Sequence, residues 1–170
     1  MATLILICGV AGAGKTTLAR QLEESLQAFR LSPDEWIKVV IRNESDKREL
    51  TRLRDPVESL QWQAAKKLLC LGVPVILENG FWGKEERARF RSEAKTLGAR
   101  VELCYLDVSK KEAWTRIESR NFELPEGSFQ IARDEFDSWW TSFTPSDPEE
   151  VKCYDAYHRV EVVQMGGALH

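Results

Sequence analysis

One short motif constrains the fold of this chain more than any other feature. Residues 9–16 read GVAGAGKT and match the pattern G-x-x-x-x-G-K-[ST]. They follow the apolar run 3–8, which is typical of a buried strand, and precede a helix-forming run at 17–23. Glycines in such a loop let the backbone approach a phosphate closely and point its N–H groups at the oxygens. The motif therefore predicts nucleotide binding directly after the first strand.

Each side chain of this loop has an expected role. Lys15 would reach the β- and γ-phosphates, and the Thr16 hydroxyl would bind Mg²⁺. A guanine-specific switch protein would also carry N-K-x-D, and D-x-x-G after the third strand, and neither is found there. The expected cofactors are therefore ATP and Mg²⁺. The nucleotide would be held by Gly9, Ala11, Gly12, Ala13, Gly14, Lys15, Thr16 and Thr17.

Composition indicates a single globular domain over residues 1–170. The chain is 43% hydrophobic and 30% charged, and its net charge of −3 gives no argument for nucleic-acid binding. No segment is long and apolar enough to span a membrane, and the N-terminus begins almost at once with a core strand, so we expect a cytoplasmic protein. The four cysteines are far apart and are expected to be reduced. No pattern specifies the oligomeric state.

Strand-like and helix-like segments alternate along the rest of the chain. Further strands are predicted at residues 28–31, 73–77, 101–106 and 159–163. Helices are predicted at residues 32–41, 56–71, 84–97, 110–120 and 129–143, with Asp55-Pro56 and Ser109-x-x-Glu112 as helix starts. Such alternation predicts an α/β fold with a parallel sheet and helices on both faces. Ligands of such sheets bind beyond the carboxyl ends of the strands.

An acidic pair follows the second predicted strand. In a phosphotransferase, Asp34 there would accept the proton of an attacking hydroxyl group. The sequence Ser32-Pro33-Asp34-Glu35 also has the form of a helix cap, which gives both acids a structural explanation. The two interpretations divide the pair: Glu35 caps the helix, and Asp34 stays free to act.

A second carboxylate, Glu78, ends the third predicted strand. A side chain at this place commonly helps to hold Mg²⁺, directly or through water, and Glu78 would otherwise face the substrate. Trp82 follows closely and would either stack on a substrate ring or pack in the protein. Arg87, one turn into the next helix, is a further candidate substrate contact, although basic helix faces are usually only solvated.

Two arginines precede a short polar segment. Arg116 and Arg120 lie near the end of the predicted helix 110–120, and residues 121–128 would form a lid. Arginines at the base of a lid can neutralise charge on a transferring phosphoryl group. They would otherwise satisfy the carboxyl end of their own helix.

Taken together, these motifs resemble small phosphate-loop kinases of the zeta-toxin, chloramphenicol phosphotransferase and polynucleotide-kinase-like group. Within that group the chain is most similar to bacterial AAA-type ATP-binding proteins that are mostly predicted kinases. The resemblance covers nearly the whole chain. It rests on GVAGAGKTTLA (9–19), RLSPDEW (30–36), VILENGFW (75–82), ERARFR (86–91), YLDV (105–108) and RIESRN (116–121).

The resemblance implies a three-layer P-loop NTPase fold with a five-stranded parallel sheet in the order 2-3-1-4-5. It implies that Lys15 and Thr16 bind phosphate and Mg²⁺ and that Asp34 is the general base. Arg116 and Arg120 match the lid arginines of the group. Glu78 departs from the pattern, because relatives often carry aspartate there.

The sequence therefore favours a kinase that moves the γ-phosphoryl group of ATP–Mg²⁺ to a hydroxyl group of a small molecule. The acceptor would be of the drug, sugar or nucleotide type, and no motif names it. A 5′-hydroxyl nucleic-acid kinase is an alternative that the acidic charge balance disfavours. A regulatory ATP-binding protein without transfer activity is another alternative.

Overall fold

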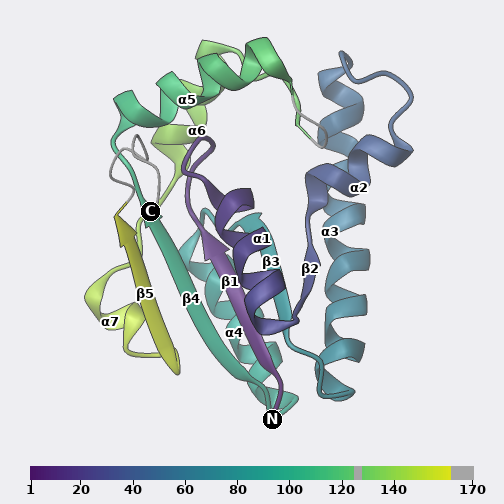
Figure 1. Cartoon of the computed structure of the whole chain (residues 1–170), viewed down its shortest axis with the longest axis vertical. Coiled ribbons are helices and arrows are strands. Elements are labelled where there is room, and N and C mark those ends of the chain that lie inside the picture. Colours follow the sequence, from purple (N-terminus) through teal and green to yellow (C-terminus); the bar gives the residue numbers. More distant parts are fainter. Residues whose placement is uncertain (125–127, 162–170) are drawn as a thin grey trace.

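The sheet has the strand order that the sequence analysis expects. The computed structural model describes residues 1–124 and 128–161. Its five parallel strands are ordered β2-β3-β1-β4-β5 (Figure 1), which confirms the predicted topology. The strands are β1 (Thr3–Cys8), β2 (Phe29–Leu31), β3 (Val75–Gly80), β4 (Arg100–Asp107) and β5 (Ala156–Glu161).

Helices connect the strands and lie on both faces of the sheet (Figure 1). In the described part of the chain they are α1 (Lys15–Leu26), α2 (Pro33–Val40), α3 (Lys47–Cys70), α4 (Lys84–Thr96), α5 (Lys110–Glu123), α6 (Arg133–Ser142) and α7 (Pro148–Val151). None of these helices has both the length and the apolar character needed to cross a membrane.

Alternation along the central strand divides the core into two layers. Leu4, Leu6 and Cys8 of β1 pack with buried residues of α3 and α4, including Trp62 and Phe90. The intervening Ile5 and Ile7 pack on the other face, where the buried partners come from α1, α5 and α6. Successive side chains of a strand point to opposite faces, so a continuous apolar run produces a strand that is covered on both sides. The helices therefore form the outer two of three layers.

The third helix begins earlier than the sequence analysis predicts. Asp55-Pro56 was expected to start it, but α3 begins at Lys47 and continues through Pro56. Asp46 caps this start, because its side chain accepts hydrogen bonds from the backbone N–H groups of the second and third helical residues. Lys47 also pairs with Glu135 of α6 across 3.1 Å. The cap and this tertiary contact stabilise the first turns. The helix therefore tolerates the loss of the one hydrogen bond that proline removes.

The start of α5 matches its prediction. The Ser109 side chain accepts from the backbone N–H of Glu112, and the Glu112 carboxylate accepts from the backbone N–H of Ser109, which is a complete capping box. The helix then runs beyond Arg120, so residues 121–123 of the predicted lid belong to α5. Residues 125–127 of that lid lie outside the described residues.

Candidate active site

The phosphate loop lies between β1 and α1, at the middle of the carboxyl edge of the sheet. Gly12 and Gly14 have φ angles of 79° and 96°, a region that side chains other than glycine seldom adopt. A Cβ atom on Gly12 would stand 2.3 Å from the backbone oxygen of Ala113. The loop is thus pressed against α5, which runs across the top of the sheet in Figure 1. Glycine at this position allows both the turn and the close approach.

Lys15 begins α1 and turns back over this loop. Its Nζ atom donates a hydrogen bond to the backbone oxygen of Val10 at 2.8 Å. Burial lowers the pKa of Lys15 to about 8, the charges of Asp34 and Glu78 oppose this shift, and the charge of Arg120 adds to it. These three charged groups come from α2, β3 and α5. Three of the predicted catalytic and metal-binding side chains therefore lie close enough to this ammonium group for their charges to affect its pKa.

Asp34 is the second residue of α2, but the acidic pair does not divide as the sequence analysis expects. Glu35 does not cap the helix; its carboxylate binds Arg30 at 2.9 Å and Arg20 at 3.1 Å. Asp34 is not free either, because its Oδ1 atom accepts from Nη2 of Arg54 at 2.6 Å. Charge-assisted hydrogen bonds to arginines from other segments bind these carboxylates more strongly than hydrogen bonds to the N–H groups of their own helix start would.

Glu78 lies near the end of β3, and its side chain is only 3% exposed. Its Oε1 atom accepts from Nη1 of Arg30 at 3.0 Å. Its Oε2 atom is buried and has no hydrogen-bond partner among the described residues. Burial raises the pKa of Glu78, while the neighbouring Ser32 hydroxyl and then the positive charges of Arg30 and Lys15 oppose that shift. One carboxylate oxygen therefore remains available for a ligand in the site.

These residues fit a nucleotide-bound magnesium ion better than a metal site made by protein alone. The described residues contain no group of three or more histidine, cysteine or acidic side chains that could hold a metal. Magnesium in phosphate-transfer sites usually takes one or two protein oxygens and completes its shell with phosphates and water. The exposed Thr16 and the unpartnered Oε2 of Glu78 are suitable oxygen donors.

The two arginines of α5 lie on the side that faces the loop. Nη1 of Arg116 lies 4.0 Å from the position that a Cβ atom on Gly14 would take. Arg120 is one turn further along, and its Nε atom is buried without a partner in the described chain. Burial lowers the pKa of Arg120, and the nearby Asp34 charge opposes this. Both side chains are thus placed to donate to an anion above the loop.

Arg87 has a different role from the one that the sequence analysis considered. It is 0% exposed, and two of its nitrogens bind the Glu150 carboxylate at 2.6 Å and 2.8 Å. Its Nη1 atom also donates to the backbone oxygens of Phe81 and Thr144, each at 2.9 Å. A guanidinium group held by these contacts in the core joins α4, α7 and the loop after β3. We therefore correct Arg87 from a substrate contact to a structural residue.

Trp82 lies after β3 and packs inward. Its ring centroid is 5.7 Å from that of Trp139 on α6, and its backbone oxygen accepts from the N–H of Thr144. The ring therefore already has an aromatic neighbour within the protein. Stacking of Trp82 on a substrate remains a prediction from its place in the sequence.

Sequence reasoning missed the arginines that bind the two carboxylates. Arg30 is 48 residues from Glu78, and Arg54 is 20 residues from Asp34. Arg54 came from a charge-dense stretch that had no periodic signal of its own. Arg54 also pairs with Glu58 at 3.4 Å on its own helix. Burial raises the pKa of Glu58 to about 7, against the opposing charge of Arg54.

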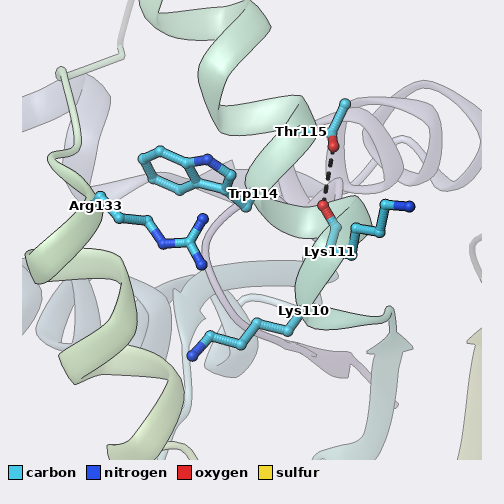
Figure 2. A pocket seen from close by; sticks show the side chains of 5 residues that line it. All are labelled: Lys110, Lys111, Trp114, Thr115 and Arg133. Atoms are coloured by element: carbon cyan, nitrogen blue, oxygen red, sulfur yellow. Dashed lines mark hydrogen bonds between the residues drawn. The ribbon is translucent and has the colours of Figure 1, made fainter.

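A separate depression of about 320 Å³ lies between α5 and α6. Figure 2 shows that it is formed by Lys110, Lys111, Trp114, Thr115 and Arg133. The Arg133 guanidinium lies over the Trp114 ring, 4.7 Å from its centroid. Lys110 and Arg133 both pair with Asp137, at 2.8 Å and 3.0 Å. No residue of the phosphate loop lines this depression, and Lys110 and Arg133 share the Asp137 carboxylate, so it is distinct from the candidate active site.

Comparisons with known structures agree with this architecture. A candidate kinase from Chloroflexus aurantiacus is 20% identical, with a TM-score of 0.76 over 94% of this chain and 88% of that chain. Kti12 from Chaetomium thermophilum, solved with ADP-AlF3, is 18% identical, with a TM-score of 0.70 over 93% and 88%. A gluconokinase from Sinorhizobium meliloti is 18% identical, with a TM-score of 0.64 over 95% and 83%. The TM-scores establish a shared fold, and at sequence identities this low the comparison shows the fold alone.

The search of curated proteins found no match. The family of the AAA domain matches residues 4–145, a span that contains the phosphate loop, Asp34, Glu78 and both arginines of α5. The matched span is most of the chain and includes every side chain that meets around Lys15. The protein therefore belongs to the AAA domain family and has the P-loop fold.

Proposed function

We propose that this protein transfers the γ-phosphoryl group of ATP–Mg²⁺ to a hydroxyl group of a small molecule. The observation that carries the proposal is that Asp34 lies at the same edge of the sheet as Lys15 and Arg120, close enough for its charge to affect the pKa values of both. Phosphoryl transfer to a hydroxyl group needs cations around the phosphate and a carboxylate on the acceptor side. A protein that only binds ATP has no need for that carboxylate.

The roles of the side chains follow from their positions. Asp34 accepts the hydroxyl proton as the acceptor oxygen bonds to the γ-phosphorus, and the bond from that phosphorus to the ADP oxygen breaks. Lys15 and the phosphate-loop N–H groups hold the β- and γ-phosphates. Arg116 and Arg120 donate to the phosphoryl oxygens as charge spreads over them. The protein thus contributes mainly position and charge.

Thr16 and Glu78 would hold the magnesium ion between protein and phosphates. The unpartnered, buried Oε2 of Glu78 supports this assignment, because a buried carboxylate oxygen without a donor is costly unless a ligand completes it. Magnesium would supply additional positive charge at the phosphates. Arg30 would keep the Glu78 carboxylate directed at the ion.

One of the similar structures supports transfer to a hydroxyl group, and another supports nucleotide binding. The first is named a gluconokinase, and the second was solved with ADP and aluminium fluoride.

The surface of α4 argues against a nucleic-acid acceptor. The basic side chains of this helix already contact acidic or aromatic groups of the protein: Lys84 with Asp147, Arg87 with Glu150, Arg89 with Phe90, Arg91 with Tyr154, and Lys95 with Asp155.

The test is ADP formation from ATP–Mg²⁺ in the presence of a panel of acceptors. The panel should contain sugars, nucleosides, sugar nucleotides, aminoglycosides, chloramphenicol-like compounds and 5′-hydroxyl oligonucleotides. We expect one small-molecule class to yield a phosphorylated product. Asp34→Asn should lower that transfer by about two orders of magnitude or more, while ATP binding stays within a few-fold.

The control for this substitution is Asp134→Asn. Asp134 is the second residue of α6, as Asp34 is of α2, so both changes remove a charge from the first turn of a helix. The control should leave transfer unchanged. If Asp34→Asn behaves like the control and only lowers thermal stability, Asp34 is a helix-start residue and not the base. A product only with oligonucleotides would favour the nucleic-acid kinase instead.

A further inference from the structure

Asp34 is held in place by a residue from another helix. Nη2 of Arg54 on α3 binds Oδ1 of Asp34 at 2.6 Å, and Nη1 of Arg54 lies 3.4 Å from the Glu58 carboxylate. Within the described chain, Oδ2 of Asp34 accepts no hydrogen bond. The pairing thus immobilises one oxygen of Asp34 and leaves the other oxygen open.

The charges around Asp34 explain why such a contact matters. Lys15 on α1 and Arg120 on α5 are both close enough for their pKa values to respond to the Asp34 charge. A carboxylate that turned toward these two cations would neutralise the groups that must bind phosphate. Arg54 approaches from α3 and competes for the same carboxylate. A charge-assisted bond of this length can hold Asp34 away from the phosphate side.

We propose that Arg54 is a positioning residue that keeps the Asp34 carboxylate on the acceptor side of the site, with Oδ2 directed at the incoming hydroxyl group. The inference rests on the proposed function, in which Asp34 is the base. Glu58 in turn restrains Arg54, as the next contact along α3. Arg54 does not contact the phosphate loop, so its effect is on turnover and not on nucleotide binding.

Stability effects can be separated from this role. The side chains of Arg54 and Asp34 are 44% and 49% exposed, and ion pairs this open contribute little to the free energy of unfolding. Arg52 provides a matched control on the same helix, because it is 72% exposed and pairs only with Glu49 among the described residues. Variants at both positions should therefore fold.

The experiment measures steady-state ADP formation from ATP–Mg²⁺, with water as the phosphoryl acceptor. Arg54→Ala should lower kcat about ten-fold or more and change KM for ATP less than two-fold. Arg54→Lys should restore only part of kcat, since an ammonium group lacks the fixed fork of a guanidinium group. Arg52→Ala should match the wild type.

A double substitution separates positioning from a merely structural role. In an Asp34→Asn background, Arg54→Ala should cause no further loss of kcat, because the residue acts through Asp34. A full additional loss there, or an Arg54→Ala enzyme with normal kcat, would overturn the inference alone. If Arg54→Ala does not fold, Arg54→Lys decides by the same criteria. A wild type that releases no ADP, with water or any acceptor of the panel, would overturn the proposed function and this inference with it.

Discussion

At the scale of single residues, the phosphate loop depends on positions where any side chain would collide with the fold. Gly12 combines a positive φ angle with a Cβ position 2.3 Å from a backbone oxygen of α5. Gly98 has a similar φ angle of 74°, but a Cβ atom there would meet nothing within 4 Å. The two glycines therefore separate backbone strain from steric contact.

Gly12→Ala should destabilise the protein by about 1–3 kcal/mol from strain alone, and further because α5 must move away from the loop. That movement displaces Arg116 and Arg120, so ATP affinity should also fall. Gly98→Ala should lower the free energy of unfolding by the strain alone and leave the ATP affinity unchanged. Urea unfolding and ATP titration measure the two effects. Equal behaviour of the two variants would show that the contact between the loop and α5 is not needed.

At the scale of elements, one buried ion pair joins segments that are distant in sequence. Arg87 of α4 binds Glu150 of α7 and also the backbone oxygens of Phe81 and Thr144. Phe81 itself has a φ angle of 49°, an uncommon conformation for a bulky residue. Arg87 therefore holds the turn after β3, and with it the end of the strand that carries Glu78.

Glu150→Ala should destabilise the protein by about 3–5 kcal/mol, because it leaves the Arg87 charge buried without its partner. The double variant Arg87→Met with Glu150→Leu should lose less than the sum of the single changes. Lys84→Ala removes an exposed ion pair with Asp147 between the same two elements, and should cost far less than Glu150→Ala. Urea unfolding of the wild type, Glu150→Ala, Arg87→Met, Glu150→Leu, the double variant and Lys84→Ala measures these losses. A loss for Glu150→Ala no larger than that for Lys84→Ala would refute the structural role of Arg87.

At the scale of the whole molecule, the parallel sheet gathers charges from distant segments at one edge. Three of the segments follow strands that end at this edge: the phosphate loop follows β1, α2 follows β2, and α5 follows β4 (Figure 1). The end of β3 itself lies at the same edge. One result is that Lys15 is a half-buried cation whose pKa falls from 10.5 to about 8. Because the folded-state pKa is lowered, the charge of Lys15 reduces the free energy of unfolding, and this reduction has its full size below about pH 8. This penalty disappears as the pH rises toward 10.5.

Lys15→Met should therefore raise the melting temperature of the ligand-free protein at pH 7, and this gain should shrink between pH 8 and pH 10.5. ATP–Mg²⁺ at about 100 times its Kd should stabilise the wild type by about 2.7 kcal/mol. Lys15→Met should lose that stabilisation. Lys67→Met, at an exposed lysine on α3, should alter neither quantity. Thermal unfolding with and without nucleotide measures both. Undiminished stabilisation of Lys15→Met by ATP would contradict the assignment of the loop.

The sequence by itself determined the parts of this protein that depend on neighbouring residues. The phosphate loop, the capping box at Ser109 and the apolar runs of the strands are patterns within a few positions, and the described structure contains each of them. The strand order agreed with the resemblance to phosphate-loop kinases. Asp34, Glu78 and Arg120 were named as candidates because they follow strands or end a helix at one edge of the sheet.

Only the tertiary structure decided which charges pair. Glu35 bound Arg30 and not its own helix start, and α3 continued through Pro56. Arg87 found Glu150 across 63 residues, and Arg54 found Asp34 from a different helix. A charged side chain has several possible partners with similar local propensities, and the choice among them follows from which helices the sheet brings together. The buried and half-buried ion pairs of this protein are therefore properties of its packing, whereas its phosphate loop and the capping box at Ser109 are properties of its sequence.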